Sequence, residues 1–268
     1  MKGFRAGHFG LRHRVVSFIS QVLFANYTYT IRHGLAQGMR RKGGLGFVPI
    51  SPGETPETKF LRELPLEGKV VYDVGAFEGV LMLFFARKAK QVISWEPNPR
   101  NFNRCTENMR LNRLQNVQLN NRGVSDRAGS IDLIYDPLMP GAGSGEKAIA
   151  DQISSSVKTA QKLTIPVLRL DDDVAQNNFP PPDLIKIDIE GMEFPALKGM
   201  EETIRSHRPA LFIEMHGATA AEKMEIAHSV IGLLESWSYK SYDVESGCYL
   251  TVATLGELRP GHLYCTCE

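Results

Sequence analysis

Acidic residues lie at or just after the ends of two apolar runs of this sequence, where parallel strands would end. Asp73 lies near the end of the run Val70–Val74, Glu78 follows it across a glycine turn, and Glu96 ends a second apolar run. Ligands of open parallel sheets bind beyond the carboxyl ends of the strands. A glycine turn followed about 20 residues later by an acid is a dinucleotide-type signature, in which the acid accepts both ribose hydroxyls.

The glycine turn from Gly75 to Gly79 has the spacing GxxxG and lacks the GxGxxG of a dinucleotide loop. A pyrophosphate bound there would meet the carboxylates of Asp73 and Glu78, which is a like-charge clash. S-adenosylmethionine carries no phosphate, and carboxylates stabilise its sulfonium and ammonium cations. The acids therefore favour this methyl donor over NAD. The structural alternative is a glycine turn beside an incidental Glu96.

A second group of ionisable residues follows two later apolar runs, Leu184–Ile187 and Ala210–Met215. Alternate residues of a strand share a face, and parallel strands end at one edge of a sheet. Side chains from both runs should therefore meet around the reacting methyl group. The predicted catalytic residues are Asp188, Glu190, Glu214 and His216.

These residues offer two candidates for the base that takes a proton from an acceptor hydroxyl. His216 is favoured because the ordinary pKa of histidine is about 6.5. Glu190 is the alternative, because crowding of carboxylates raises their pKa values. A further alternative is a divalent cation held by Asp188, Glu214 and His216, although no metal is predicted.

Other ionisable residues near these runs have a structural interpretation. Lys186 is expected to neutralise Asp188. Glu193 is expected to cap or pair on the surface of a single helix over 194–206, and His262 is given no role.

From residue 69 onward, strand-like runs alternate with helical patterns, the second of which begins at Pro99. Repeated strand–helix–strand units predict a doubly wound α/β fold, with a mostly parallel sheet and helices on both faces. A strand-rich tail from residue 239 predicts an antiparallel edge. The segment 140–161 is expected to be a loop and a candidate lid.

The first 53 residues contain eight Lys or Arg and no Asp or Glu, whereas the other 23 bases share the rest of the chain with all 30 acids. Apolar periodicity predicts a helix within 12–40, followed by a Gly- and Pro-rich linker. The predicted organisation is a basic, partly helical extension at 1–50 and one domain at 51–268. The basic arm indicates an anionic partner, such as a membrane surface reached by residues 1–42, a phosphorylated substrate or RNA. The alternative is that it packs against the acidic body of the same chain.

The composition limits the class of protein. Of 268 residues, 43% are hydrophobic and 23% are charged, as in an ordinary soluble globular protein, which excludes collagen-like and disordered classes. Four cysteines without CxxC spacing predict neither a disulfide framework nor a structural zinc site. The apolar run at 15–25 is too short to span a bilayer and precedes no cleavage site, so a cytoplasmic protein is expected.

Ordered motifs across residues 57–217 resemble the FkbM family of S-adenosylmethionine-dependent methyltransferases. They are Val70–Gly79, Trp95–Pro99, Asn108 with Leu111–Asn112, Gly123–Asp126, Leu170–Asp172, Asp183–Glu193 and Ile213–His216. The resemblance implies a class I methyltransferase fold, Rossmann-like, with a seven-stranded sheet whose last strand is antiparallel. It also implies methylation of hydroxyl oxygens, often of sugars or secondary metabolites.

By the same resemblance, Asp73, Gly75 and Glu96 lie at positions that bind the donor, and Asp126 lies near its adenine. Glu78 departs from the residue common in the family, and it is expected either to touch the donor or substrate or to point to solvent. The predicted donor-binding set is Asp73, Gly75, Glu78, Gly79, Glu96, Asp126 and Asp188.

The predicted reaction is direct in-line transfer of a methyl group from S-adenosylmethionine to a hydroxyl of a sugar, glycan or secondary-metabolite acceptor. One alternative is an RNA methyltransferase that uses the basic arm. Nucleic acid is disfavoured as a partner, because proteins that bind it usually place exposed aromatic residues among their Lys and Arg residues. Tyr27 and Tyr29 are weak candidates for such stacking residues. Another alternative is a non-catalytic protein that retains the fold, against which the acids at the strand ends argue.

Overall fold

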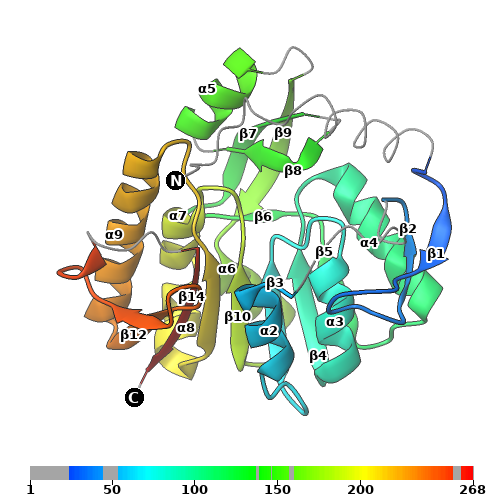
Figure 1. Ribbon diagram of the computed structural model, residues 1–268, viewed down its shortest axis with the longest axis horizontal. Coiled ribbons are helices and arrows are strands. Elements are labelled where there is room, and N and C mark those ends of the chain that lie inside the picture. Colours follow the sequence, from blue (N-terminus) through cyan, green and yellow to red (C-terminus); the bar gives the residue numbers. More distant parts are fainter. Residues whose placement is uncertain are drawn as a thin grey trace.

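The computed structural model describes residues 24–44, 54–136, 139–145, 147–156, 160–255 and 261–267, and its largest element is an eight-stranded sheet (Figure 1). In spatial order the strands are β13 (Cys248–Leu250), β12 (Tyr239–Asp243), β14 (His262–Cys267), β11 (Ala210–Glu214), β10 (Leu184–Ile187), β3 (Val70–Val74), β4 (Gln91–Trp95) and β5 (Val117–Asn120). The strands from β11 to β5 are parallel, and β14 runs antiparallel between β11 and β12. The predicted mostly parallel sheet with an antiparallel last strand is confirmed. The short strand β13 extends the expected seven strands by one at the edge.

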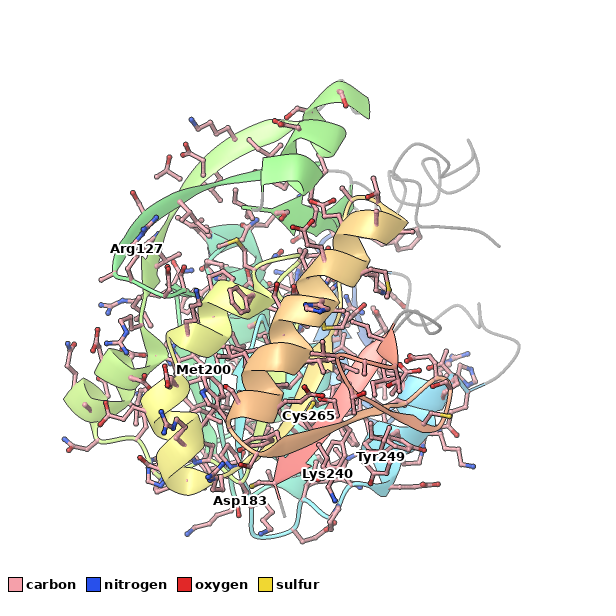
Figure 2. All side chains as sticks on the ribbon, turned by 90° about the vertical axis from the view of Figure 1, so that its left-hand side faces the viewer. Arg127, Asp183, Met200, Lys240, Tyr249 and Cys265 are labelled. Carbon is pink, nitrogen blue, oxygen red and sulfur yellow. The ribbon has the colours of Figure 1, made fainter. Side chains whose placement is uncertain are left out.

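Helices cover both faces of this sheet, as the alternating pattern predicted. One face packs against α2 (Pro56–Glu63), α3 (Val80–Lys88) and α4 (Pro99–Asn112). The other packs against α6 (Leu170–Asn177), α7 (Glu193–Lys198), α8 (Glu201–His207) and α9 (Ala220–Ser236). Figure 2 shows α9 in front of β14, where Cys265 lies. Within the described part of the chain, no helix is long and apolar enough to cross a membrane.

The order of the strands places a crevice beside β3. The chain leaves β3 on one side to form β4 and β5, and it later forms β10 and β11 on the other side. The connections that leave the carboxyl ends of β3 and β10 therefore diverge, and such a point is where open α/β sheets bind their ligands.

The single helix expected over 194–206 is wrong, because the structure has two helices, α7 and α8, with a break at Gly199. A side chain at Gly199 would overlap the backbone oxygen of Ser125, so this position packs directly against another segment of backbone. The carboxylate of Asp171 accepts hydrogen bonds from two N–H groups in the first turn of α8, at 3.1 and 2.9 Å. The break thus has a packing cause, and a side chain distant in sequence caps the second helix.

A second sheet, not predicted from the sequence, lies beyond the carboxyl ends of the central strands. We call it the cap sheet. Its order is β6 (Gly123–Val124), β9 (Gln161–Leu168), β7 (Gly129–Asp136) and β8 (Met139–Ser144), and α5 (Lys147–Ser156) packs on β7 and β8. The loop expected over 140–161 is therefore wrong for the described residues of that segment. Alternate residues Ile131 and Leu133 of β7, and Ile165 and Val167 of β9, give the cap sheet an apolar face.

Residues 24–44, the described part of the basic arm, form a β-hairpin. Its strands are β1 (Thr28–Thr30) and β2 (Arg40–Lys42), which pair antiparallel. Tyr29 and Leu35 are buried in the same hydrophobic core as α3. The helix predicted within 12–40 is therefore wrong for this segment, and residues 12–23 lie outside the described part of the chain.

Candidate active site

The loop after β3, from Gly75 to Gly79, has a backbone conformation that few residues adopt. The φ angles of Gly75, Phe77 and Gly79 are 88°, 52° and 80°, all in the left-handed region. A side chain at Gly75 would also overlap the backbone oxygen of Asp188, at the end of the neighbouring strand β10. Both the torsion angle and the available space therefore require glycine at position 75.

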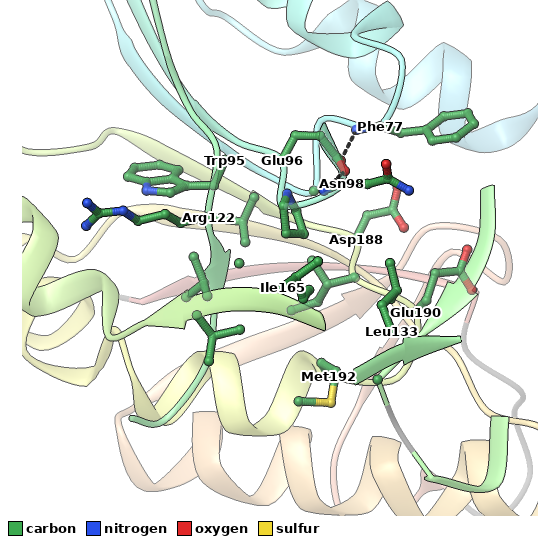
Figure 3. Close-up of a pocket in the computed structure, with 18 of the residues that line it drawn as sticks. Phe77, Trp95, Glu96, Asn98, Arg122, Leu133, Ile165, Asp188, Glu190 and Met192 are labelled. Atoms are coloured by element: carbon green, nitrogen blue, oxygen red, sulfur yellow. Dashed lines mark hydrogen bonds between the residues drawn. The ribbon is translucent and has the colours of Figure 1, made fainter. Parts of the chain in front are cut away.

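Glu96, at the end of β4, is buried beneath this loop with 5% of its surface exposed. Its Oε2 accepts the N–H of Phe77 at 2.8 Å, and its Oε1 accepts the N–H of Asn98 at 2.9 Å and the side chain of Asn101 at 3.3 Å (Figure 3). Burial raises the pKa of Glu96 to about 7, although these donors stabilise its charged form. Since a carboxylate has about four acceptor positions, Oε2 retains a lone pair for a further donor.

Glu96 lines a cavity of about 320 Å³ between the central sheet and the cap sheet, a size suited to a small molecule. Its acidic wall comes from the carboxyl ends of β4, β10 and β11 and contains Glu96, Asp188, Glu190 and Glu214. Its apolar wall contains Ile131, Leu133, Ile165 and Val167 of the cap sheet, with Met192. The cavity therefore sets carboxylates opposite an apolar surface (Figure 3).

Asp73, predicted to bind the donor, is fully buried and is not among the residues that line this cavity. Its Oδ1 lies 3.3 Å from Nζ of Lys186, which also lies 3.2 Å from Asp188 and donates to the backbone oxygen of Gly75 at 2.8 Å. Burial alone would lower the pKa of Lys186, but Asp188 and Asp73 raise it above its usual value. Lys186 therefore ties the loop to the acidic wall, and Asp73 supports the site through Lys186.

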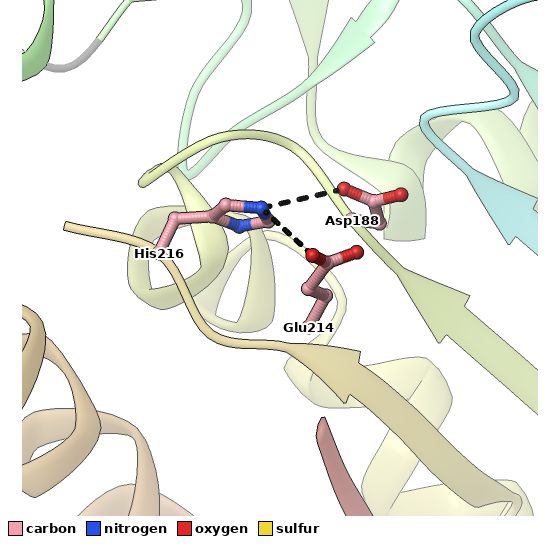
Figure 4. Close-up of side chains that lie close together, drawn as sticks. All are labelled: Asp188, Glu214 and His216. Atoms are coloured by element: carbon pink, nitrogen blue, oxygen red, sulfur yellow. Dashed lines mark ion pairs between the residues drawn. The ribbon is translucent and has the colours of Figure 1, made fainter. Parts of the chain in front are cut away.

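His216 follows β11 and lies among carboxylates from two segments of the chain (Figure 4). Its Nδ1 is 2.9 Å from Oε1 of Glu193. Its Nε2 is 3.4 Å from Glu214, 3.7 Å from Glu190 and 3.8 Å from Asp188. We call these five residues the charged cluster. The structure thus brings together the four residues that the sequence predicted to meet, and it adds Glu193.

The charge of His216 differs from the expectation. Burial alone would lower its pKa, but hydrogen bonds with Glu193 and Glu214 raise the pKa of His216 well above the ordinary 6.5. These contacts favour the imidazolium form of the ring, which has no lone pair with which to accept a proton. The role of His216 as general base therefore stays a prediction, and the raised pKa favours Glu190, the alternative base.

Glu190, the alternative base, has a pKa closer to neutral pH than that of an ordinary carboxyl group. Burial raises the pKa of Glu190 to about 8, although the charge of His216 opposes this shift. Its φ angle of 54° is rare for a residue other than glycine, and such strain is common at functional positions. Its backbone oxygen accepts a hydrogen bond from the hydroxyl of Ser144 in the cap sheet. The cap sheet therefore helps to hold Glu190 at the cavity.

Asp188, Glu214 and His216 could also hold a metal ion, since their nearest ligand atoms lie within 4.8 Å of one another. Carboxylates and imidazole are common ligands of divalent ions. A histidine ligand must be neutral, however, and the carboxylates around His216 favour its charged form. A proton on the ring and a metal ion are therefore alternative sources of positive charge in this cluster.

Three other members of the predicted donor-binding set are not among the residues that line the cavity. Gly79 caps the N-terminus of α3, and Asp126 is exposed. Glu78 forms an ion pair with Arg41 of the hairpin, and its side chain is 12% exposed. The loop turns Glu78 toward the hairpin, so its carboxylate does not point to solvent, which corrects that expectation, and it is not among the residues that line the cavity.

Glu193 and His262 had no predicted catalytic role, but each interacts with a residue that was predicted to be catalytic. Glu193 is fully buried instead of lying on a helix surface. Nε2 of His262 lies 3.6 Å from Glu214. Burial alone would lower the pKa of His262, but Glu214 and Glu245 raise it to about 10. Glu214 therefore lies between two imidazolium rings. The density of acids after β10 is the sequence feature that could have indicated a place for Glu193 in the site.

The protein family follows from the region that carries this site. Residues 73–241, more than half of the chain, match the model of the methyltransferase FkbM domain. The chain belongs to the FkbM methyltransferase family. The resemblance seen in the sequence motifs is confirmed, and the matched region includes the loop after β3, Glu96 and the whole charged cluster.

Curated members related to this FkbM chain include two that are named for sugar or O-methylation. Hexuronic acid methyltransferase AglP of Haloferax volcanii is 32% identical over 165 residues, which are 61% of this chain and 63% of the relative. 2-O-methyltransferase NoeI of Sinorhizobium fredii is 29% identical over 154 residues, 52% of this chain and 60% of the relative. The chain thus spans less than two thirds of the length of these relatives.

A solved FkbM structure supports the same fold. The methyltransferase FkbM from Methylobacillus flagellatus superposes with a TM-score of 0.51 at 19% sequence identity, over 79% of this chain and 48% of that chain. At this identity the likeness concerns the fold alone, and it agrees with the class I methyltransferase architecture of the central sheet.

Proposed function

We propose that this protein is an S-adenosylmethionine-dependent methyltransferase that acts on a hydroxyl oxygen of a sugar, glycan or secondary metabolite. One observation carries the proposal: Glu96 and members of the charged cluster line the same cavity. A carboxylate suited to ribose and groups suited to proton transfer thus face one space. The names of the hexuronic acid methyltransferase and the 2-O-methyltransferase support a sugar hydroxyl as acceptor.

The residues of the cavity fit the chemistry of this donor. S-adenosylmethionine supplies an electrophilic methyl group on a positively charged sulfur. Glu96 would accept a ribose hydroxyl, because Oε2 retains a lone pair, and Asp188 would stabilise the positive charge. The phosphates of a dinucleotide would meet the same carboxylates as like charges, which argues against NAD.

Glu190 is the group that we assign to the proton of the acceptor hydroxyl. In its carboxylate form it would take this proton as the acceptor oxygen bonds to the methyl carbon and the bond from that carbon to sulfur breaks, which leaves S-adenosylhomocysteine. A positioned base contributes about 10²–10⁴-fold to a rate. His216 acts beside it as a fixed positive charge that holds Asp188, Glu190 and Glu214 together. Asp188 and Glu214 then orient the acceptor, and alignment supplies much of the remaining rate.

The cap sheet is the proposed element for acceptor selection. Its apolar side chains Ile131, Leu133 and Ile165 form the wall opposite the carboxylates. A sugar ring has one hydroxyl-rich edge and apolar C–H faces, so the two walls suit its two kinds of surface. The hydrogen bond from Ser144 to Glu190 couples this wall to the proposed base.

Calorimetric titration with S-adenosylmethionine, S-adenosylhomocysteine and NAD tests the donor. We expect the two adenosyl compounds to bind and NAD not to bind. Glu96→Ala should weaken adenosyl binding about 10- to 100-fold, because hydrogen bonds to charged groups contribute about 1.5–3 kcal/mol. Glu67→Ala, at an exposed position, is the matched control. Failure of the wild type to bind either adenosyl compound would overturn the proposed function.

A further inference from the structure

The described part of the basic arm packs on α4 and on the outer side of the loop 75–79. The edge of β2 is completed by amide side chains of α4 in place of another strand. Asn112 accepts from the N–H of Arg40 and donates to its backbone oxygen, both at 2.7 Å. Asn108 accepts from the N–H of Lys42 at 2.9 Å. The position of β2 relative to α4 is therefore fixed by hydrogen bonds between the backbone of β2 and side chains of α4.

The loop 75–79 needs contacts to hold its conformation, because Phe77 has a positive φ that costs about 1–2 kcal/mol. On the inner side of the loop, the N–H of Phe77 donates a hydrogen bond to Glu96. On the outer side, Cys105 of α4 donates to the backbone oxygen of Phe77 at 3.1 Å, and Asn108 donates to that of Glu78 at 3.0 Å. Asn108 thus bonds to both the hairpin and the loop.

The hairpin also contacts the loop directly, through the ion pair between Arg41 and Glu78. The two side chains are 15% and 12% exposed, so solvent screens this pair less than it screens a surface pair. The neighbouring pair of Lys42 with Glu107 joins the same strand to α4 at 2.6 Å, with side chains 25% and 40% exposed. This second pair does not involve the loop, so it serves as a control for the effect of the pair between Arg41 and Glu78.

We propose that the hairpin of residues 24–44 positions the donor-binding loop, and that Arg41 is its positioning residue through Glu78. If the loop shifts, the N–H of Phe77 no longer fixes Oε2 of Glu96, and the carboxylate that receives the ribose loses its orientation. The effect on the donor rests on the proposed function, whereas the ordering of the loop does not. Two bases of the arm, Arg41 and Lys42, thus pair with acids of the same chain.

The experiment compares Arg41→Met with Lys42→Met in the full chain. Each removes one charge of the same strand, but only Arg41 bonds to the loop. We expect Arg41→Met to weaken S-adenosylhomocysteine binding about tenfold by calorimetry, a change of about 1.4 kcal/mol. Lys42→Met should stay within about twofold of the wild type. Amide hydrogen exchange of residues 77–79 should become faster in Arg41→Met and stay unchanged in Lys42→Met.

A double-mutant cycle guards against an unrelated effect of the substitution. Glu78→Gln should weaken binding to a similar extent, and the double variant should be no weaker than either single variant, because both remove one interaction. Equal exchange in Arg41→Met and the wild type would overturn the inference, whether or not the donor binds. If the wild type failed to bind S-adenosylhomocysteine while the exchange difference held, the proposed function would fail and the positioning of the loop would stand.

Discussion

Oε1 of Glu193 lies 2.9 Å from Nδ1 of His216, and Glu193 is fully buried. The same oxygen accepts the N–H of Gly191 at 3.0 Å, so the carboxylate is fixed from two directions. Because Glu193 holds Nδ1, the Nε2 atom of His216 is turned toward Asp188, Glu190 and Glu214. Glu193 does not line the cavity, but it orients the ring of His216 toward three carboxylates that do.

Glu193→Gln should lower the pKa of His216, because it removes a buried negative charge that stabilises the imidazolium while keeping an acceptor for Nδ1. The titration of the His216 ring, followed by NMR, measures this directly. Glu245→Gln is the matched control, since Glu245 contacts His262 instead. An unchanged His216 pKa in Glu193→Gln would show that the other carboxylates suffice.

The rate of methyl transfer should rise with pH as Glu190 loses its proton, because only its carboxylate form accepts the hydroxyl proton. Below a pKa of about 8, kcat/KM should fall about tenfold per pH unit. In Glu190→Gln this rise should disappear and kcat should drop about 10²–10⁴-fold, with the affinity for S-adenosylhomocysteine unchanged. A Glu190→Gln enzyme that kept the wild-type pH profile would remove Glu190 from the role of base.

The stability of the protein should depend on pH through Glu96. Its pKa rises from 4.5 to about 7 on folding, so the folded state binds the proton more tightly than the unfolded state. This contribution is fully present below pH 4.5 and is lost as the pH rises through about 7, a change of about 3 kcal/mol. Glu96→Gln cannot ionise, so its free energy of unfolding relative to the wild type should increase between about pH 5 and pH 8. Urea titrations at both pH values measure it, and a constant difference would contradict the assignment.

Two glycines with positive φ should respond differently to alanine. Gly34 has a φ of 82° and nothing within 4 Å of an added Cβ, so Gly34→Ala should cost about 1–2 kcal/mol from the torsion alone. At Gly75 an added Cβ also overlaps the backbone oxygen of Asp188, so Gly75→Ala should cost more than about 4 kcal/mol or prevent folding. Denaturant titrations compare the two variants, and equal costs would mean that the loop yields easily.

Methyl transfer should persist in excess chelator, because the carboxylates around His216 favour its imidazolium form, which cannot bind a metal ion. Assays with and without chelator, followed by addition of Mg²⁺ or Mn²⁺, measure this. Loss of activity that Mg²⁺ restores would instead identify Asp188, Glu214 and His216 as metal ligands.

The central sheet was predictable because its strands are short β-branched runs separated by helical patterns, as at 70–74 and 91–95. The cap sheet was missed although Leu163, Ile165 and Val167 alternate in β9. Its strands pair across a segment rich in Gly and Pro, which has the local composition of a loop. The hairpin at 24–44 was missed because its stability comes from packing on the core, as the burial of Tyr29 shows.

The candidate site was predictable as a set of residues but not as a set of charges. Strand ends placed Asp188, Glu190, Glu214 and His216 together, since parallel strands end at one edge. Whether the ring accepts or donates a proton depends on Glu193 and on burial, and neither follows from spacing. The outward turn of Glu78 depends likewise on the hairpin, which is distant in sequence.

Strand β14 pairs with β11 on one side and with β12 on the other, although both precede it in the chain. During synthesis, the edges of β11 and β12 therefore stay open until residues 262–267 have been made. Open strand edges carry unpaired backbone groups that pair readily with other chains, which leads to aggregation. A nascent chain should consequently be most vulnerable just before β14 emerges from the ribosome, and chaperones present at that stage should have the largest effect on the yield of folded protein.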